Sequence, residues 1–466
     1  MNKLFDNLEE FKSKIALVDT NGKEFSYKEI LAKINYINSK IQQKSLILII
    51  VSNSSESIIG YISFIRSNHI SILLDKSFKL EYVKKIIKKY RPNYIFSPKK
   101  YLGEYDKNHK IISLENYNLI KTNYKKYKNI NKKNLLLLST SGTTQSPKLV
   151  RLSSLNLQNN TNNIIKYLKI NSGHITITTM PMAYSYGLSI INTHIQSGSK
   201  IIVNDKSIFD KSFWDKLYKY KVTSLGGVPQ FYEQLIKLKF EDMQLPYLKY
   251  LTQAGGELDK NSLKYFDKVC KNKKIKFIVM YGQTEAAPRM SYLQWNKFSV
   301  KLGSIGKALE GSKFKIVDEN GRYIKKSNIT GELVFFGKNV SLGYASNLRD
   351  LSKGDINKGK LFTGDLAYKD HDNYVYIVGR KNRISKIFGL RINLDDIEKY
   401  LKKNDYKVKC ISDNKYLKLA ILNNYDTENI KKIIHNFYGI NKNFIIISKV
   451  KKFSNTNLFK ETITTA

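Results

Sequence analysis

The sequence predicts an α/β protein with a large N-terminal body of βαβ layers, a β-rich region and a small, mobile α+β domain toward the C-terminal end. Before about residue 300, short apolar runs alternate with amphipathic stretches, which is typical of βαβ units and largely parallel sheets. Turn-rich segments follow to about residue 380, and a lysine-rich α+β segment comes after them. We therefore expect a large domain over 1–380, β-rich from about 300, and a small domain over 381–466.

Each part of this prediction rests on identifiable segments. The apolar runs of the body are bounded by turn residues and read SLILIIVSN at 45–53, ISILLD at 70–75, YIFSP at 94–98, ITITTMP at 175–181 and KIIVND at 200–205. The hairpins of the β-rich region are predicted from GSIGKALEGSKFKIVDENGR, TGELVFFG and NYVYIVGR, in which turn residues separate strand-forming runs. In the small domain, LDDIEKY begins a predicted helix.

Composition and charge exclude several classes of protein. A chain of 466 residues with 42% hydrophobic residues and 7 prolines has a globular profile, so disorder and coiled coil are excluded for the whole chain. The net charge of +41 would attract a polyanion, an acidic protein or anionic lipid. Its lysines are spread along the chain among many asparagines and isoleucines, which indicates a compositional bias. We find no recognition-helix pattern, zinc spacing or RNP-like string, so nucleic-acid binding is the weaker hypothesis.

The cysteines and the first residues indicate the compartment. Cys270 and Cys410 are the only cysteines and lie far apart, which predicts neither a disulfide framework nor a cysteine metal site. Asp6, Glu9 and Glu10 stand where a signal peptide would need an apolar stretch. The apolar runs are much shorter than a membrane span. We therefore expect a soluble, cytoplasmic protein.

The most informative segment is LLLLSTSGTTQSPKLVRLS at 135–153. Four leucines predict a buried strand, and a hydroxyl-rich turn follows it. Glycine lets backbone N–H groups converge on an anion, hydroxyls add donors and lysine adds a positive charge. The segment lacks the GxxxxGK[ST] pattern of a Walker A loop. An isolated loop of this composition is more often a solvated turn, but its place directly after a strand favours phosphate binding. The phosphate-binding residues would be Thr140, Ser141, Gly142, Thr143, Thr144 and Lys148.

This loop resembles that of the adenylate-forming superfamily, which includes acyl-CoA synthetases, luciferases and peptide-synthetase adenylation domains. The family's loop reads TSGTTGxPKG, and this chain has TSGTTQSPKL, with Gln145 and Leu149 in place of two glycines. The resemblance extends over most of the chain. It implies that Mg²⁺ and ATP are used to convert a carboxylic acid to an acyl-adenylate, with Thr144 and Lys148 stabilising charge. It also implies transfer of the acyl group to a thiol of coenzyme A or of a carrier protein's phosphopantetheine.

A second segment, IVMYGQTEAAPR, fills all four defined positions of the family's Tyr-Gly-x-Thr-Glu motif. The predicted strand IVM delivers Tyr281, a flat face for adenine, and Gly282, which leaves room for the backbone to approach a ligand. By resemblance, Thr284 contacts the α-phosphate and Glu285 holds Mg²⁺, an ion that takes oxygen ligands. On its own, a glutamate after a strand is more often a helix N-terminal acid. The resemblance thus implies a nucleotide site at Tyr281, Gly282, Gln283, Thr284 and Glu285.

Two further segments resemble nucleotide-binding parts of the family. LTQAGGELD ends a predicted strand in a glycine turn, and the family's equivalent of Gly255, Gly256 and Glu257 lines the adenine pocket with its main chain. In LFTGDLAYKDHDNYVYIVGR, Asp365 matches the carboxylate that accepts hydrogen bonds from the ribose hydroxyls, and Arg380 matches a ribose-facing residue at the domain border. Either segment alone would be interpreted as an ordinary turn.

The small domain carries the residues that the resemblance links to the two half-reactions. Lys386 matches the face used for thiol transfer. SNTNLFK at 454–460 resembles the family's PRTxxGK string, with Lys460 at the lysine that binds the reacting carboxylate and the α-phosphate. The proline, arginine and glycine of that string are replaced by Ser454, Asn455 and Phe459. An adenylate-binding protein with little or no ligase activity therefore stays an alternative.

The acid pocket is indicated by PMAYSYGLS at 181–189, which resembles the family's Pro-x-x-His-x-x-Gly element with Tyr184 at the histidine position. Amino-acid-activating relatives carry an aspartate near here, and this chain does not. A buried ammonium without a counter-charge is costly, so we expect a carboxylic acid that is not an α-amino acid. Gly227, within 226–232, and the segment 286–289 are expected to complete the pocket. The strong positive charge would suit an acidic acyl carrier protein as a partner.

Overall fold

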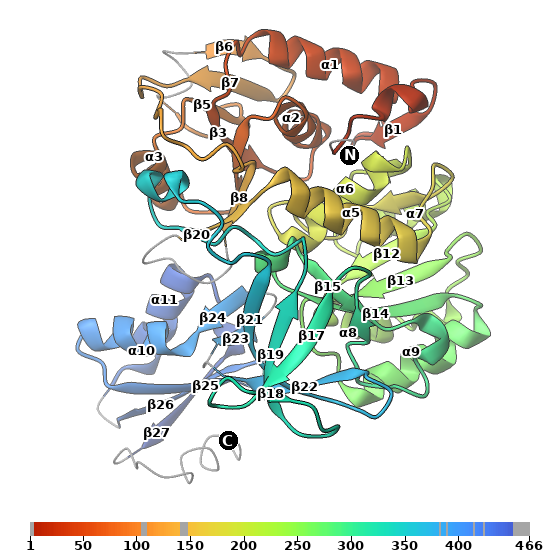
Figure 1. Cartoon of the computed structure of the whole chain (residues 1–466), viewed down its shortest axis with the longest axis vertical. Coiled ribbons are helices and arrows are strands. Elements are labelled where there is room, and N and C mark those ends of the chain that lie inside the picture. The colour runs from red at the N-terminus through yellow and green to blue at the C-terminus, as the bar shows by residue number, and fades with distance from the viewer. Residues whose placement is uncertain are drawn as a thin grey trace. The chain divides into compact units, whose positions relative to one another are not determined.

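The computed structural model describes residues 4–103, 110–139, 148–381, 384–387, 390–412, 415–422 and 425–450. They form two compact units (Figure 1). The first unit contains the described residues up to Ser139 and those from Lys148 to Val378, and the second contains the described residues from Gly379 on. Strands and helices alternate through most of the first unit, so the predicted α/β class is confirmed.

The first sheet of the first unit has the strand order β20-β9-β8-β4-β3-β5-β7-β6. Its strands are β3 Leu46–Val51, β4 Ile70–Asp75, β5 Tyr94–Pro98, β6 Lys110–Ser113, β7 Tyr117–Lys121, β8 Leu136–Ser139, β9 Leu149–Leu152 and β20 Tyr344–Ala345. Strands β8, β4, β3 and β5 run parallel. All six residues of β3 are buried, as expected of a parallel strand that is covered on both faces.

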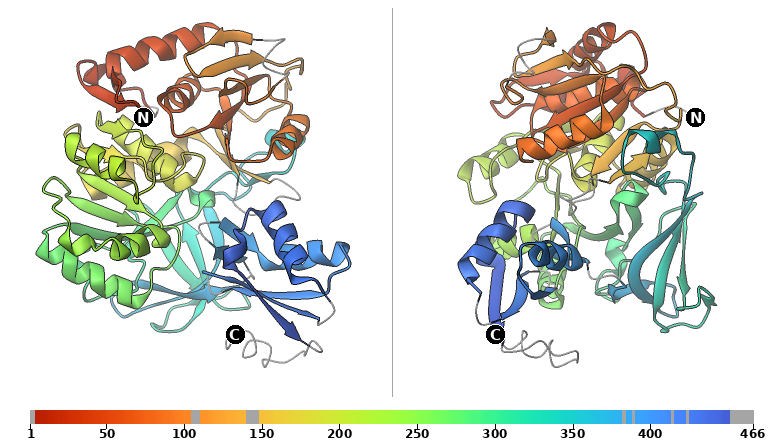
Figure 2. Two further views of the ribbon diagram at one scale, coloured as in Figure 1. Left: turned by 180° about the vertical axis from the view of Figure 1, so that it is seen from behind. Right: turned by 90° about the vertical axis from the view of Figure 1, so that its left-hand side faces the viewer.

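Helices cover both faces of this sheet (Figure 1, Figure 2). They are α1 Tyr27–Ser39, α2 Ser55–Arg66 and α3 Leu80–Tyr90. Ile47, Ile49 and Val51 of β3 pack in the cluster that contains α1 and α2, whereas Leu48 and Ile50 pack in the cluster that contains α3. This division explains the uninterrupted apolar run, because successive side chains of a strand point to opposite faces.

The second sheet has the order β16-β15-β14-β13-β12-β10-β11-β1-β2. Its strands are β1 Ile15–Val18, β2 Glu24–Ser26, β10 Ile175–Ile177, β11 Lys200–Ile202, β12 Ser224–Gly227, β13 Tyr250–Gln253, β14 Lys276–Gly282, β15 Arg289–Tyr292 and β16 Lys307–Ala308. The six strands from β14 to β1 in this order run parallel. Gly227 pairs with Gln253, and Gln253 pairs with Val279, so the strands β12 to β14 end at one edge.

Five helices flank the second sheet: α5 Ser154–Leu168, α6 Ser185–Gln196, α7 Lys211–Lys219, α8 Pro229–Lys237 and α9 Lys260–Asn272. Apolar side chains of α7, α8 and α9 pack with Leu225, Leu251 and Phe277 on one face. Tyr250 and Met280 point to the other face and pack with residues of α5 and α6. The sheet is therefore covered on both sides near the ends of β12, β13 and β14.

The region from about 300 to 380 forms an antiparallel sheet with the order β18-β17-β19-β21-β22. Its strands are β17 Lys313–Val317, β18 Tyr323–Ile324, β19 Gly331–Phe336, β21 Lys360–Lys369 and β22 Val375–Arg380. β17 pairs antiparallel with β18 and β19, and β19 pairs antiparallel with β21. The predicted change from parallel to antiparallel structure is confirmed.

The second unit has its own apolar core. Its elements are β23 Ile384–Ile387, β24 Leu390–Asn393, α10 Leu394–Lys403, β25 Val408–Ser412, β26 Leu417–Leu422, α11 Thr427–Tyr438 and β27 Ile445–Val450. Ile397 and Leu401 of α10 and Ile430 and Ile434 of α11 pack in the cluster that contains β25 and β26. The helix predicted from LDDIEKY is α10.

Short 3₁₀ helices also occur in the described residues. They are η1 Leu8–Phe11, η2 Phe240–Asp242, η3 Thr284–Ala286, η4 Trp295–Lys297, η5 Leu348–Ser352 and η6 Lys442–Phe444. Cys270 and Cys410 are both buried, and neither is part of a disulfide bond. None of the helices in the described ranges has the length and apolar character that a membrane crossing needs.

Candidate functional site

The carboxyl edge of the second sheet brings several predicted segments together. Tyr184 follows β10, Gly227 ends β12, Gly255 and Gly256 follow β13, and 281–285 ends and follows β14. Because these four strands are parallel neighbours, their carboxyl ends meet at the same edge. Ligands of open parallel sheets bind at such edges. We therefore place the candidate site here.

Asp365, on β21, is held by two residues that follow β14. Its side chain is 2% exposed. The Tyr281 hydroxyl donates to Asp365 Oδ2 at 2.5 Å, and Gln283 Nε2 donates to the same oxygen at 2.9 Å. Gln283 Nε2 also lies 2.9 Å from the carbonyl oxygen of Thr363, and the backbone N–H of Asp365 donates to Thr363 Oγ1 at 3.1 Å. These contacts set the orientation of a buried carboxylate beside the residues predicted to bind a nucleotide.

Glu285, in η3, is also 2% exposed. The hydroxyl of Tyr344, on β20, donates to Glu285 Oε1 at 2.6 Å. The backbone N–H of Ser341 donates to the carbonyl oxygen of Glu285 at 2.8 Å. The contacts come from a segment about 59 residues further along the chain, so they could not be predicted from the motif.

The ligand groups around Glu285 are compatible with the Mg²⁺ ion that the resemblance implies. No cluster of three or more His, Cys, Asp or Glu side chains is found in the described residues. Magnesium usually keeps several waters and is held by one or two carboxylates together with substrate phosphates. A single buried carboxylate next to the threonine that is predicted to contact the α-phosphate fits that mode, whereas a site built from protein side chains alone would need more ligands.

Thr284 contacts the beginning of helix α6. Its Oγ1 lies 3.0 Å from Ser185 Oγ, and the two hydroxyls form a hydrogen bond. Tyr184 is the N-cap residue of α6 and its side chain is 38% exposed. Burial of part of the side chain, with Asp75 nearby, raises the pKa of Tyr184. The predicted acid-pocket element is thus brought next to the predicted phosphate-contacting threonine.

The glycine turn after β13 depends on glycine. Gly255 has φ +90°, which disfavours other residues. A Cβ atom on Gly256 would lie 3.0 Å from Pro229 Cγ. Gln253 Nε2 donates to the carbonyl oxygen of Gly256 at 2.8 Å and holds the turn. Glu257 is exposed, so the turn presents mainly backbone to a ligand, as the predicted adenine-lining role requires.

The remaining predicted residues fall in other parts of the structure. Lys148 is exposed and directly precedes β9, where Leu149 pairs with Ser139 of β8. Arg380 is the last residue of β22 and is partly exposed. Lys386 lies in β23, opposite Arg391 of β24. The other predicted residues lie outside the described ranges, and they are Thr140, Ser141, Gly142, Thr143, Thr144 and Lys460.

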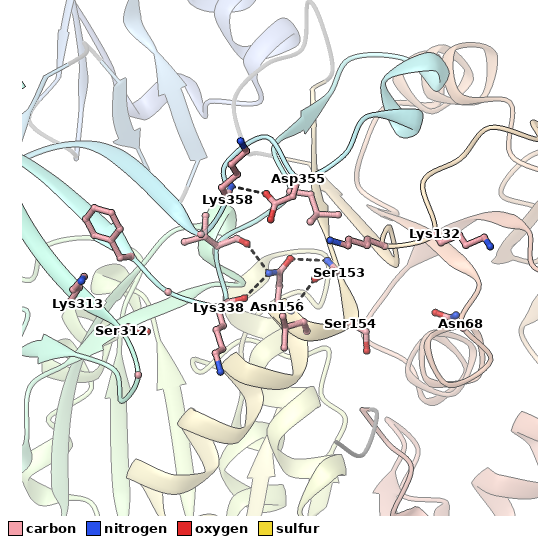
Figure 3. A pocket seen from close by; sticks show the side chains of 18 residues that line it. Asn68, Lys132, Ser153, Ser154, Asn156, Ser312, Lys313, Lys338, Asp355 and Lys358 are labelled. Carbon is pink, nitrogen blue, oxygen red and sulfur yellow. Dashed lines mark hydrogen bonds between the residues drawn. The ribbon is translucent and has the colours of Figure 1, made fainter.

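A large cavity lies elsewhere in the first unit (Figure 3). Its volume is about 800 Å³, and none of the predicted site residues lines it. Ser153 and Asn156 on its wall form the capping box of α5, and Asn156 Nδ2 donates to the carbonyl oxygens of Lys338 and Val340, each at 2.7 Å. These two residues therefore fasten the start of α5 to the segment that follows β19.

Two residues of the candidate site make contacts that were not predicted. Gln283 occupies the variable position of its motif, yet its amide orients Asp365. Tyr344 was not predicted at all, and its hydroxyl orients Glu285. A motif match assigns no role to a variable position, and no local pattern marks a tyrosine that acts across the fold.

Comparisons with known proteins show the family to which the chain belongs. Residues 4–345 match the family model described as AMP-binding enzyme. The 2-succinylbenzoate–CoA ligase of Bacillus cereus is 29% identical over 271 residues, which cover 58% of this chain and 54% of that protein. The oxalate–CoA ligase of Arabidopsis thaliana is 27% identical over 271 residues, covering 57% of this chain and 52% of that protein. The chain thus aligns with about half the length of these curated relatives.

The fold is also found among solved structures. A variant of the o-succinylbenzoate CoA synthetase of Bacillus subtilis matches with a TM-score of 0.77. The match covers 100% of this chain and 98% of that chain, at 16% sequence identity. At this identity the similarity concerns the fold, and the chemistry has to be argued from the residues of the site.

Proposed function

The chain belongs to the AMP-binding enzyme family, and on this premise we propose that it is an AMP-forming acid–thiol ligase. It would activate a carboxylic acid, other than an α-amino acid, with ATP and transfer the acyl group to a thiol. The observation that carries the proposal is the buried Asp365 carboxylate, held by Tyr281 and Gln283 at the carboxyl edge of the second sheet. A carboxylate in this position can accept hydrogen bonds from the two hydroxyls of a ribose, and charge-assisted bonds of this kind are strong.

In the first half-reaction, a carboxylate oxygen of the acid attacks the α-phosphorus of ATP. An oxygen–phosphorus bond forms, the bond to pyrophosphate breaks, and the acyl-adenylate results. Phosphoryl chemistry asks the protein mainly for positioning and charge stabilisation. We assign these roles to Thr284 at the α-phosphate, with Thr144, Lys148 and Lys460 as further groups that oppose the developing negative charge. Glu285 would hold Mg²⁺, which neutralises phosphate charge.

In the second half-reaction, the sulfur of the thiol attacks the acyl carbon and AMP leaves. We propose that the small domain over 381–466 turns between the two half-reactions, with Lys386 on the face used for transfer. The proposed hinge is Asn382, which lies outside the described residues. Asparagine tolerates unusual backbone angles better than most residues. The thiol is that of coenzyme A or of a carrier-protein phosphopantetheine, and the net charge of +41 suits an acidic carrier. The lack of a disulfide bond between the two cysteines suits a cytoplasmic location.

A second candidate function rests on departures from the family pattern. Gln145, Leu149, Asn455 and Phe459 stand where relatives have glycine, glycine, arginine and glycine. A protein with these changes could bind an adenylate with little or no ligase activity. It would bind ATP as tightly as the ligase does, so binding alone does not separate the two functions.

The test is a panel of acids, including aliphatic, aromatic and α-amino acids, incubated with the protein, ATP and Mg²⁺. The ligase predicts pyrophosphate release that depends on the acid, and a larger rate with a simple carboxylate than with any α-amino acid. Binding of ATP without pyrophosphate release across the panel would support the second candidate. A larger rate with an amino acid would contradict the proposed substrate class.

A further inference from the structure

A small cavity lies beside the candidate site, between the second sheet and helices α5 and α6. Met280, Gly226 and Tyr186 are among its lining residues, and each is within two positions of a predicted site residue. The volume that the centre of a water molecule can occupy there is about 20 Å³, which is room for one or two water-sized groups. Residues that line the cavity are therefore sequence neighbours of residues at the edge where the acid is proposed to react.

Arg289 brings a positive charge to this cavity. It is 2% exposed, and its backbone pairs with that of Gly282 in the neighbouring strand. The guanidinium carbon lies 4.8 Å from the centroid of the Tyr186 ring. No carboxylate of the described residues forms an ion pair with it. Its Nε has no hydrogen-bond partner there, and its guanidinium interacts with the hydroxyl of Tyr167. A buried charge without a counter-charge is costly. An anion in the cavity would balance the positive charge of Arg289.

Other polar groups also line the cavity. The buried hydroxyls of Ser224 and Tyr250 interact with each other, and the buried Nε2 atom of His194 has no hydrogen-bond partner among the described residues. Burial raises the pKa of Tyr250 to about 12, so its hydroxyl remains a donor at neutral pH. Burial also lowers the pKa of His194 to about 4. His194 Nδ1 lies 2.8 Å from the carbonyl oxygen of Ile190, so Nδ1 carries the hydrogen and Nε2 is an acceptor.

Arg151 shows how the same fold satisfies an arginine that serves structure alone. Its side chain is fully buried, and its two terminal nitrogens donate to three backbone carbonyl oxygens, those of Leu342 at 2.7 Å, Gly354 at 2.9 Å and Lys353 at 2.5 Å. The Nε of Arg151 has no partner either, so the two arginines differ in their terminal nitrogens, for which Arg289 has the Tyr167 hydroxyl and no backbone carbonyl oxygen among the described residues. Arg289 thus keeps a buried charge that an anionic group of a bound molecule could balance.

We infer that the acid activated by this protein carries a second carboxylate, which enters the cavity and pairs with the Arg289 guanidinium. This inference rests on the proposed function and narrows its substrate to short dicarboxylic acids. A planar guanidinium matches the two oxygens of a carboxylate, and the hydroxyls of Tyr250 and Ser224 add donors beside it. The small volume accommodates a terminal carboxylate and excludes a bulky group.

The test compares acids that differ only in the terminal group opposite the reacting carboxylate. Malonate, succinate and glutarate are each paired with the monocarboxylate of the same carbon number, and succinate also with its monomethyl ester. For each acid, kcat/KM is measured from pyrophosphate release. We expect the kcat/KM of at least one dicarboxylate to exceed that of its monocarboxylate counterpart, and for succinate also that of the monomethyl ester, by about 30-fold or more, as for a buried charge pair that loses one partner. A wild-type preference for monocarboxylates would overturn the inference.

Substitutions test whether Arg289 is responsible for the preference for dicarboxylates. Arg289→Met should lower kcat/KM for dicarboxylates far more than for monocarboxylates and so abolish the preference, and Arg289→Lys should keep part of it. Arg322→Met, at an exposed arginine of the β17–β18 hairpin, is the matched control and should change neither. If Arg289→Met lowers kcat/KM equally for dicarboxylates and monocarboxylates at an unchanged melting temperature, the inference is overturned. Arg289 would then be a structural residue that is solvated by water. If Arg289→Met fails to fold, Arg289→Lys and Tyr250→Phe take its place, and an unchanged preference in both overturns the inference.

Calorimetric titration separates this inference from the proposed function. If no acid gives pyrophosphate, the ligase proposal fails, and binding of succinate and butyrate is then compared for the wild type and Arg289→Met. Succinate binding that is lost in the variant would support the dicarboxylate subsite without the reaction. Absent binding, or equal binding of both acids, would overturn the inference as well.

Discussion

The hydroxyl of Tyr281 donates a hydrogen bond to Oδ2 of Asp365, although the two residues are 84 positions apart. Tyr281 lies in β14 of the second sheet, and Asp365 lies in β21 of the antiparallel sheet. The bond therefore joins the two sheets where the nucleotide is proposed to bind. It fixes a buried carboxylate next to an aromatic ring, which is the combination that a ribose and its base require.

Replacing Asp365 with alanine should weaken ATP binding. The change removes acceptors for the ribose hydroxyls, and each charge-assisted hydrogen bond contributes about 1.5–3 kcal/mol. We expect the Kd for ATP, measured by calorimetry, to rise by about tenfold or more. Asp372→Ala is the control, because Asp372 is on the surface and pairs with Lys301. Unchanged ATP affinity in a folded Asp365→Ala variant would show that Asp365 has only a structural role in its turn.

Replacing Glu285 with glutamine should impair turnover that depends on Mg²⁺ more than it impairs folding. The substitution keeps the shape of the side chain and removes the charge that would hold the ion. Tyr344→Phe keeps the charge and removes the 2.6 Å hydrogen bond to Oε1, so its apparent Mg²⁺ affinity should fall by about tenfold, less than in Glu285→Gln. Magnesium titrations of the rate and thermal melts are compared for both variants. A Glu285→Gln enzyme with the wild-type magnesium dependence would exclude the ligand role.

Lys460 and Lys386 should affect different half-reactions. Lys460→Ala should abolish adenylate formation and leave transfer from a supplied acyl-adenylate to the thiol, because in the proposed mechanism the small domain presents a different face in each step. Lys386→Ala should have the opposite effect. Phe459→Gly should raise the rate of the first step, since glycine gives the segment more conformational freedom. Equal effects of Lys460→Ala on both half-reactions would show that another residue provides the charge.

Acid should destabilise the fold through buried histidines. His69 is 3% exposed, and burial lowers its pKa to about 4, with Lys44 and Lys126 acting in the same direction. Between about pH 6.5 and 4 the unfolded chain binds a proton that the folded chain does not, so stability falls as pH falls. At pH 5 the loss from His69 is about 2 kcal/mol relative to neutral pH.

The variant His69→Asn tests this source of acid sensitivity. The Asn amide oxygen can replace Nδ1 as acceptor for the backbone N–H of Ser45, which lies 3.2 Å from that atom. The free energy of unfolding in urea is measured at pH 7 and pH 5 for both proteins. The variant should lose less stability between the two pH values than the wild type, and an identical loss would exclude His69.

Much of the fold could be predicted because its main signals are local. The run LILIIV is apolar at every position, which is sufficient to predict a strand covered on both faces, and β3 is buried throughout. The change to hairpins near residue 300 is likewise carried by nearby turn residues. The convergence of Tyr184, Gly227 and Gly255 follows from one rule, because parallel neighbours place their carboxyl ends at the same edge.

The parts of the site that could not be predicted depend on packing between distant segments. Tyr344 reaches Glu285 from β20, which no period or spacing in the sequence indicates. Arg289 lies within the segment expected to complete the acid pocket. Its burial and its lack of a carboxylate partner emerge only when α5, α6 and β14 surround it. A sequence pattern thus predicts which segments meet, and the packing decides which charges remain unpaired.

The transfer of an oxygen atom tests the central claim most directly. The protein is incubated with ATP, Mg²⁺, the thiol and a carboxylic acid labelled with ¹⁸O in its reacting carboxylate, and the AMP formed is analysed by mass spectrometry. Attack of the carboxylate on the α-phosphorus leaves one labelled oxygen on AMP when the acyl group departs to the thiol. We predict AMP with one ¹⁸O atom for each acyl thioester formed. Thioester formation with unlabelled AMP, or with ADP as the product, would contradict the adenylate mechanism.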